Sequence, residues 1–123
     1  MKQCFEVQGV PKSSHSHVVK AGNFLFTTGQ MGRDSDGKML DGIENQTRQT
    51  LLNLKTVVEA AGSTLDNVVR ITVFVTNLED VPKMNEVYFR EFFPANRPAR
   101  TCVEVSGIAL GALLELDAVI YCD

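Results

Sequence analysis

The amino-acid sequence predicts a single α+β domain, spanning residues 1–123, in which two helices cover one face of a mixed β-sheet. Segments that alternate apolar and polar residues, or that are rich in β-branched residues, indicate strands. Two segments with apolar residues at steps of three and four indicate helices, and the predicted order is β-β-α-β-α-β-β. Two helices cannot cover both faces of such a sheet, so the other face needs a partner, which a homo-oligomer would supply.

The first third of the chain is predicted to consist of short strands and loops. Turn residues and alternation predict a short edge strand at 4–7, a loop at 9–14, a hairpin of strands 16–21 and 24–28 around Gly22-Asn23, and a polar loop at 33–42. Gly29 and Gly32 follow the second hairpin strand. Glycine tolerates unusual dihedrals and lets another segment approach closely, so a close backbone approach is expected there.

The remaining elements carry clearer signals. Residues 43–61 form the strongest helix pattern, with Gly62 as its stop. A second helix is expected between Asp80, a candidate N-cap, and Pro94, with Pro82 tolerated in its first turn. The chain also contains a β-branched central strand at 68–76, a strand at 99–105, a loop at 107–111 and a last strand at 113–121.

Composition narrows the class of protein. The 123 residues suffice for one hydrophobic core, and the net charge of −3, without a basic block, argues against a nucleic-acid partner. Aromatic residues are few and Trp is absent, so stacking platforms for single strands are not expected. No apolar run reaches the length of a membrane span, and Met1–Cys4 is not followed by an apolar signal region. The sequence thus predicts a cytoplasmic protein without a membrane partner.

An arginine lies at the start of the strand predicted at 99–105. Pro98 fixes its own φ just before this strand. The alternation that follows places Arg100, Cys102 and Glu104 on one face. A guanidinium is always charged and offers a planar fork of donors that matches a carboxylate. Two interpretations stay open: Arg100 binds a small carboxylate ligand, or it is a surface residue paired with an acid.

The histidines and cysteines do not form a metal-binding pattern. His15 and His17 would face one side of a strand, but two imidazoles supply at most half of a zinc site. The three cysteines are odd in number and widely spaced, without a zinc or CxxC pattern, which predicts reduced thiols. We therefore expect no metal. His15 has two open interpretations, an acid/base group in a cleft or a surface histidine.

Several segments match one known family. They are residues 98–105 with Leu114-Glu115-Leu116, the triplet Thr28-Gly29-Gln30, and Asn85-Glu86-Val87-Tyr88 with Phe92-Phe93-Pro94. On these residues, and over almost its whole length, the chain resembles the RidA/YjgF family of small trimeric enamine/imine deaminases. The resemblance implies a chorismate-mutase-like fold of the bacillus type and a homotrimeric barrel with the helices outside. It also implies ligand sites in the clefts between subunits, and neither a metal nor a cofactor.

The resemblance also assigns roles to individual residues. Arg100 matches the arginine that holds the substrate carboxylate, and Glu115 matches the glutamate that positions or activates the attacking water. These two residues are the expected catalytic pair. Cys102 matches a cysteine that lines the cleft. No histidine is placed in the sequence to activate the Cys102 thiol as a nucleophile, so a role in lining the site is the favoured interpretation.

Four further residues are expected to contact the substrate. Thr28 and Gly29 match a Ser-Gly pair that borders the ligand, and Asn85 matches another residue of the cleft. His15 occupies the position at which the best-known active members carry the tyrosine of a Gly-Pro-Tyr segment. This departure from the family pattern implies an altered substrate range or a lower activity.

The reaction that the resemblance implies is hydrolytic deamination of 2-aminoacrylate-type enamines and imines to 2-keto acids and ammonia. Binding the carboxylate of such an acid would orient the imine, and Glu115 would take a proton from water. Two alternatives stay open: a trimer that binds small carboxylates without catalysis or with another specificity, and an aminomuconate-type deaminase in a catabolic pathway. RNA cleavage, attributed to some relatives, is disfavoured by the acidic charge balance.

Overall fold

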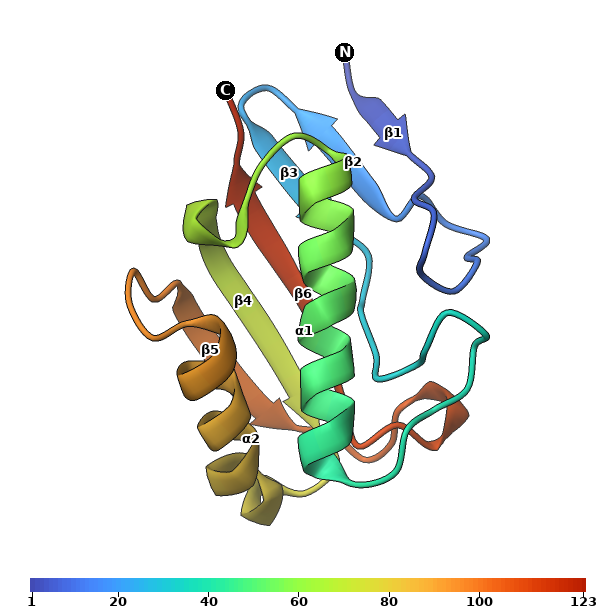
Figure 1. Cartoon of the computed structure of the whole chain (residues 1–123), viewed down its shortest axis with the longest axis vertical. Helices are drawn as coiled ribbons and strands as arrows, with labels where there is room; N and C mark the ends of the chain where they lie inside the picture. Colours follow the sequence, from blue (N-terminus) through green and yellow to red (C-terminus); the bar gives the residue numbers. More distant parts are fainter.

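The computed structural model describes residues 1–123 and has two layers, a β-sheet and a pair of helices packed on one of its faces (Figure 1). The strands are β1 (Gln3–Phe5), β2 (Val18–Ala21), β3 (Phe24–Thr27), β4 (Val68–Val75), β5 (Ala99–Glu104) and β6 (Leu114–Tyr121). The helices are α1 (Ile43–Ala60) and α2 (Val81–Val87), with the short turns η1 (Leu65–Asn67), η2 (Leu78–Asp80), η3 (Tyr88–Phe92) and η4 (Ala109–Gly111). The predicted α+β class, with both helices on one face, is confirmed.

The six strands follow the order β1-β2-β3-β6-β4-β5 across the sheet. Strands β4 and β5 run parallel, and every other neighbouring pair is antiparallel, so the sheet is mixed as predicted. A parallel pair cannot be joined by a tight turn, and α2 with its neighbouring turns makes the crossover from β4 to β5. The C-terminal strand β6 lies inside the sheet, between β3 and β4.

The alternating burial of side chains along β6 distinguishes the two faces of the sheet. Leu114, Leu116, Ala118 and Ile120 are buried on the side of the helices, whereas Glu115, Asp117 and Val119 between them are half-buried. The register pairs Leu116 with Val73, which is also buried on the side of the helices. Buried and more exposed side chains alternate along β4 as they do along β6, so both strands bury the same face of the sheet. The helix-side residues belong to one hydrophobic core, in which each fully buried aliphatic side chain is worth about 1.5–3 kcal/mol.

The face of the sheet without helices, called the open face below, carries large apolar side chains. Phe26 on β3 is 45% exposed, and Val103 on β5 and Tyr121 on β6 are each 40% exposed. Phe24 packs its ring edge-on against Tyr121, with the ring centroids 5.9 Å apart. Monomeric proteins rarely expose large contiguous apolar patches. The open face is therefore a candidate interface.

Helix α1 stops as predicted at Gly62. The φ of Gly62 is +95°, its N–H donates to Glu59 O at 3.1 Å, and Ser63 N–H donates to Val58 O at 3.1 Å. These two bonds form a Schellman motif, which satisfies carbonyls at the helix end and favours glycine because of the positive φ. Neither α1 nor any other helix combines the length and the apolar character needed to cross a membrane.

The second helix differs from the prediction at both ends. Asp80 does not cap it, because Asp80 itself has helical dihedrals as the last residue of η2. Asn77 instead caps η2, since its side chain accepts a hydrogen bond from Glu79 N–H at 3.0 Å. Beyond α2 the chain widens into η3, a π-type turn in which Phe93 N–H donates to Tyr88 O at 2.9 Å. Such turns are rare and often occur at functional sites.

Candidate functional site

The residues predicted to act together lie in two groups, on opposite faces of the sheet. Arg100 pairs with Ile71 in the register of β5 and β4, which places it on the side of the helices. Glu115 pairs with Phe74 and belongs to the open face. One chain therefore does not bring Arg100 and Glu115 together. The first group contains Arg100, Cys102 and Asn85, and the second contains His15, Thr28, Gly29 and Glu115.

The first group centres on Arg100, Asn85 and Tyr88, called the Arg100 cluster below. Arg100 lies on the edge strand β5, and Asn85 and Tyr88 lie one turn apart on α2 and η3. The guanidinium carbon of Arg100 is 4.7 Å from the centroid of the Tyr88 ring and 5.3 Å from that of Phe89. These cation–π contacts hold the guanidinium against the helix layer. Cys102 shares the face of Arg100, as the alternation predicts.

Three polar atoms of the Arg100 cluster are buried without a hydrogen-bond partner: Arg100 Nη1, Asn85 Oδ1 and Tyr88 Oη. No carboxylate pairs with Arg100, since the ion pairs of the chain lie elsewhere. This excludes the interpretation of Arg100 as part of a surface ion pair. A buried polar group without a partner costs about 1–3 kcal/mol, and more if it is charged. The cluster is therefore a candidate binding site for a ligand with an anionic group.

Burial also changes the acid–base properties of the groups around Arg100. Burial raises the pKa of the Tyr88 phenol, and the positive charge of Arg100 offsets part of this rise. Burial likewise raises the pKa of the Cys102 thiol, again against an opposing effect of Arg100. The thiolate is the nucleophilic form, and a raised pKa makes it scarce at neutral pH. Cys102 is therefore poorly suited to nucleophilic attack.

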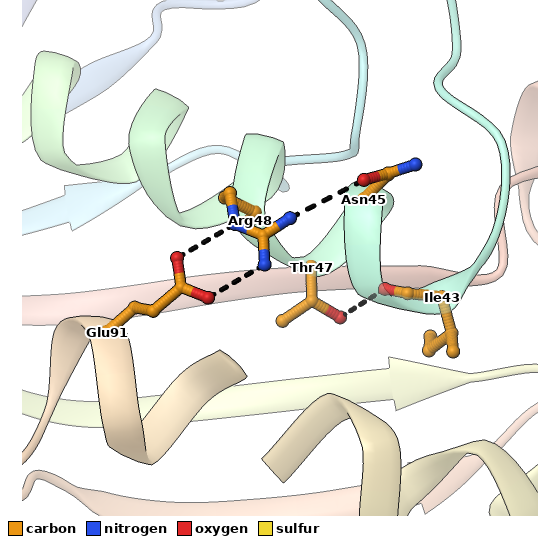
Figure 2. Close-up of polar contacts among 5 residues, drawn as sticks. All are labelled: Ile43, Asn45, Thr47, Arg48 and Glu91. Carbon is orange, nitrogen blue, oxygen red and sulfur yellow. Dashed lines mark hydrogen bonds and ion pairs between the residues drawn. The ribbon is translucent and has the colours of Figure 1, made fainter. Parts of the chain in front are cut away.

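An ion pair fixes the turn that carries Tyr88. Arg48 on α1 donates from Nε to Glu91 Oε1 at 2.8 Å and from Nη2 to Glu91 Oε2 at 2.7 Å (Figure 2). Arg48 also donates to Asn45 Oδ1 at 3.4 Å. Its hydrogen bonds and charge lower the pKa of Glu91, which lies on η3. A two-bond fork is directional, so it sets the position of η3, and with it Tyr88, against α1.

The second group lines a cavity of about 270 Å³, called the Glu115 pocket below. Among the predicted residues, His15, Thr28, Gly29 and Glu115 contribute to its wall. The residues of the Arg100 cluster do not. The polar part of the lining also includes Lys12, Ser13, Gln30, Arg33 and Asn53. The pocket thus joins the segment before β2, the segment after β3 and strand β6.

The close backbone approach expected at Gly29 is confirmed, and its partner is Glu115. A Cβ on Gly29 would collide with the Glu115 carboxylate, whose Cδ would lie 2.8 Å away. The next residue, Gln30, exchanges both backbone hydrogen bonds with Leu116, at 2.7 Å and 3.0 Å. This pairing fixes the segment after β3 alongside β6. The missing side chain at Gly29 therefore makes room for the carboxylate of Glu115.

Two carboxylates lie on the open-face side of β6. Burial raises the pKa of Glu115, and the negative charge of Asp117 raises it further. Burial also raises the pKa of Asp117, with a partial offset from Arg70. A general base works best when its pKa approaches the operating pH. The surroundings of Glu115 therefore favour the acceptance of a proton from water.

The hairpin strand predicted at 16–21 is confirmed only from Val18, where β2 begins, so His15 and His17 lie in the loop before it. His15 lines the Glu115 pocket while remaining exposed to solvent. His17 is buried, and its Nδ1 accepts a hydrogen bond from Val7 N–H at 2.9 Å, so its Nε2 carries the proton and donates to Pro11 O at 2.9 Å. Both nitrogens of His17 thus serve the loop before β2. No group of three or more His, Cys, Asp or Glu residues lies close enough together to hold a metal ion.

Sequence reasoning missed two kinds of residue at these sites. Tyr88 is not among the site residues predicted from the sequence, although its spacing of three residues from Asn85 indicates a shared face. Lys12 and Arg33 line the Glu115 pocket from loops. A loop has no periodic pattern from which the direction of a side chain follows, so no sequence signal indicates these two cations.

Comparison with known proteins identifies relatives along nearly the whole chain. A family model described as Endoribonuclease L-PSP matches residues 7–122. A RutC family protein of Pyrococcus horikoshii is 42% identical over 125 residues, which cover 98% of each chain. A 2-iminobutanoate/2-iminopropanoate deaminase of Dermatophagoides farinae is 33% identical over 112 residues, which cover 89% of this chain and 87% of that relative.

Solved structures show the same fold. The crystal structure of RidA from the Antarctic bacterium Psychrobacter sp. PAMC 21119 has a TM-score of 0.92 and 32% identity, covering 97% of this chain and 98% of that one. The crystal structure of Escherichia coli TdcF with bound serine has a TM-score of 0.88 and 30% identity, covering 98% and 99%. The sequence relatives and the solved structures thus indicate the same class of small α+β protein. The chain belongs to the RidA/YjgF/RutC family, as its motifs predict.

Proposed function

We propose that the protein hydrolyses reactive 2-imino acids, and the enamines that tautomerise to them, to 2-keto acids and ammonia. The observation that carries this proposal is the Arg100 cluster, because a half-buried guanidinium whose buried Nη1 has no partner fits the carboxylate of such an acid. Two comparisons support it. One relative is named as an imine deaminase, and the TdcF structure holds serine, an amino acid with the same carboxylate.

The reaction needs a held carboxylate, a placed water and a base. Arg100 would bind the carboxylate through two parallel hydrogen bonds, which fixes the orientation of the imine. The water oxygen adds to the carbon of the protonated imine while Glu115 accepts one proton from the water, and a neutral carbinolamine forms. Glu115 returns this proton to the amino group, the C–N bond breaks, and ammonia leaves with the hydroxyl proton as the C=O bond forms. The net change is the gain of one water and the loss of one ammonia, without a metal or cofactor.

We infer that the complete site forms between subunits of a homotrimer. Arg100 and Glu115 lie on opposite faces of the sheet in one chain, so a second copy is needed to bring them together. The exposed apolar side chains of the open face support burial against such a copy. In a chorismate-mutase-like barrel with the helices outside, the open faces would point inward. Each cleft would then join the Arg100 cluster of one subunit to the Glu115 pocket of the next.

The other predicted residues take supporting roles in this proposal. Thr28, Gly29 and His15 would border the imine from the Glu115 pocket, and Asn85 would contact the carboxylate end. Cys102 would line the cleft beside Arg100 rather than attack the substrate. The polar lining of the Glu115 pocket also favours a second candidate, a deaminase of different specificity such as an aminomuconate-type enzyme.

The experiment that tests the proposal follows the hydrolysis of imino acids made in situ by an amino-acid oxidase. The formation of 2-keto acid and ammonia is compared between the wild type, Arg100→Ala and Arg97→Ala. Arg97 is the matched control, because its guanidinium also stacks on Phe89, at 4.2 Å, but is exposed to solvent. We expect Arg100→Ala to lose at least about a hundredfold in kcat/KM, since the ligand loses a two-bond charge-assisted contact.

The assembly of each variant is measured by light scattering, so that a lost interface is not mistaken for a lost carboxylate site. A trimeric Arg100→Ala protein that hydrolyses imino acids as fast as the wild type would refute the role of Arg100. A wild-type trimer that binds small carboxylates but accelerates no hydrolysis would support the alternative of a binding protein without catalysis.

A further inference from the structure

The Glu115 pocket has a polar lining that the proposed reaction leaves partly unused. Only three of its 14 lining residues are hydrophobic. Glu115, Thr28, Gly29 and His15 have proposed roles next to the imine. An aliphatic substrate side chain would bury little apolar surface here and would displace water from polar groups, which costs free energy. The pocket is therefore better suited to a substrate with a polar side chain.

Lys12 and Arg33 give this pocket two cationic groups. Neither takes part in any ion pair of the chain. Arg33 is half-buried and uses only its Nε, which donates to Gly37 O at 3.0 Å, so its two Nη groups are left for a ligand. Glu115 is the one carboxylate in the lining. The cations thus outnumber the carboxylate in the pocket of a chain whose net charge is −3.

The segment that carries Arg33 is fixed on α1. Asn53 donates from Nδ2 to Arg33 O at 2.9 Å and to Met31 O at 3.1 Å. The close approach expected at Gly32 is confirmed, because a Cβ there would lie 2.6 Å from the Cα of Gln46. A charged group on an anchored segment loses less conformational freedom when it binds a ligand. Arg33 is therefore placed in advance rather than recruited by the ligand.

The segment that carries Lys12 is anchored in a similar way. Lys12 directly follows Pro11, whose carbonyl accepts the hydrogen bond from the buried His17 at 2.9 Å. The Lys12 side chain itself is exposed and forms no hydrogen bond or ion pair within the chain. The loop before β2 and the loop after β3 thus bring one cation each to the same cavity.

Resting on the function proposed above, we propose that the Glu115 pocket receives the side chain of the imino acid, and that Lys12 and Arg33 select side chains ending in a carboxylate. The preferred substrates are then 2-imino dicarboxylic acids, which arise when amino acids like aspartate or glutamate are oxidised at the α-carbon. Arg100 holds the carboxylate next to the imine, and the two cations of the pocket hold the distal carboxylate through charge-assisted hydrogen bonds.

The test compares dicarboxylic with neutral substrates. Oxidases generate imino acids from aspartate, glutamate, alanine and leucine, and kcat/KM is obtained from competition with a semicarbazide trap. We expect Lys12→Met and Arg33→Met each to lower kcat/KM for the dicarboxylic imino acids by about tenfold, and to change that for the neutral ones by less than about twofold. Arg33→Lys keeps the charge and should keep most of the preference. Lys38→Met is the matched control, because Lys38 lies in the same loop but does not line the pocket.

The neutral substrates show whether a variant is still folded and assembled. Equal losses on neutral and dicarboxylic substrates would overturn the proposal, because Arg33 would then hold the carboxylate next to the imine or support the fold. Unchanged kcat/KM values in both variants would overturn it as well.

Binding of the stable analogues malate and lactate, measured by calorimetry, separates this proposal from the proposed function. A preference for malate that Arg33→Met and Lys12→Met abolish supports selection of a distal carboxylate even in a protein that hydrolyses no imino acid. A malate preference without hydrolysis would refute the proposed hydrolase activity, but not the selection of a distal carboxylate. Equal affinities for malate and lactate would refute the selection by Lys12 and Arg33.

Discussion

The guanidinium carbon of Arg100 lies 4.7 Å from the centre of the Tyr88 ring, yet neither the Tyr88 hydroxyl nor Arg100 Nη1 has a hydrogen-bond partner. The ring face therefore supports the cation, while the polar atoms of both side chains stay available to a third group. A carboxylate can accept hydrogen bonds from both residues at once. The aromatic contact thus stabilises the guanidinium, and the unpaired atoms are available to bind a ligand.

Tyr88→Phe removes a buried hydroxyl without a partner and keeps the ring beside Arg100. We expect the variant to be as stable as the wild type or more stable by up to roughly 1 kcal/mol, because an unsatisfied group is lost. The KM for imino acids should rise by up to about tenfold, since one donor to the ligand is missing. Urea unfolding and steady-state kinetics measure the two effects. Tyr121→Phe, which removes the hydroxyl of a ring on the open face and outside the Arg100 cluster, is the control, and a marked loss of stability in Tyr88→Phe alone would contradict the expectation.

Gly29→Ala should displace the Glu115 carboxylate, because the new Cβ and the carboxylate require the same space. We expect kcat to fall by at least about tenfold while the protein stays folded, since proton transfer depends on the position of the base. The control is Gly107→Ala, whose Cβ would meet nothing within 4 Å. Kinetics and circular dichroism compare the two variants. Equal activity in both would mean that Glu115 does not act from its observed position.

The pH profile of kcat/KM should report the surroundings of Glu115. Its pKa lies above the ordinary value of 4.5 because of burial first and the charge of Asp117 second. A base must be ionised to act, so activity should fall on the acidic side at a higher pH than for an ordinary glutamate. Asp117→Asn removes the neighbouring charge, lowers the pKa of Glu115 and should shift this acidic limb to lower pH. An unshifted limb in Asp117→Asn would assign the titration to another group.

The same raised pKa makes the stability of the fold depend on pH. Glu115 binds its proton more tightly in the folded chain than in the unfolded chain. Its contribution is therefore fully present below the ordinary value of 4.5 and is lost as the pH rises through the raised folded value. Glu115→Gln cannot ionise, so it should match the wild type at low pH and exceed it in stability above that window. Urea unfolding across the pH range measures the difference, and a variant less stable than the wild type at neutral pH would contradict the sign.

The two histidines should respond to substitution in opposite ways. His17→Ala leaves Val7 N–H and Pro11 O without their partner, and should cost about 2–4 kcal/mol of stability. His15→Ala removes an exposed side chain, and should change stability by less than about 0.5 kcal/mol while altering the kinetics. Denaturant unfolding distinguishes them. Comparable destabilisation by both variants would show that His15 also has a structural role.

A charge on the open face should prevent assembly. Phe26→Asp places a carboxylate in the apolar surface that we propose to be buried between subunits, where desolvating a charge is costly. Leu52→Asp is the matched control, since Leu52 on α1 is 43% exposed and Phe26 is 45% exposed. We expect light scattering to show a smaller assembly for Phe26→Asp only. An unchanged assembly in Phe26→Asp would place the interface elsewhere.

Local patterns in the sequence predict the elements and the faces of single strands. The alternation in residues 99–105 correctly places Arg100 and Cys102 on one face, because side chains of a strand alternate whatever the strand pairs with. The same alternation does not predict which side chains of one strand lie on the same face of the sheet as those of another strand. That relation depends on pairings such as Glu115 with Phe74, between residues far apart in sequence. The separation of Arg100 from Glu115 could therefore not be read from either strand.

Irregular segments were the second limit of prediction. Asp80 is of a residue type that favours the N-cap position. However, the turn η2 directly precedes the helix, and Asp80, its last residue, has helical dihedrals. Arg33 reaches the Glu115 pocket because Asn53 holds its loop on α1, a contact between distant residues that no local pattern encodes. Loop conformation follows from such contacts, so the cations of the pocket become apparent only in the folded chain.

The placement of Arg100 and Glu115 on opposite faces has a consequence for mixtures of defective chains. In the homotrimer that we propose, each cleft takes its arginine from one chain and its glutamate from the next. A chain without Arg100 impairs one of the two clefts that it borders and still completes the other. Arg100→Ala and Glu115→Gln chains, each inactive by itself, would therefore restore one intact cleft in every mixed ring. Two alleles with these defects would complement each other in the same cell.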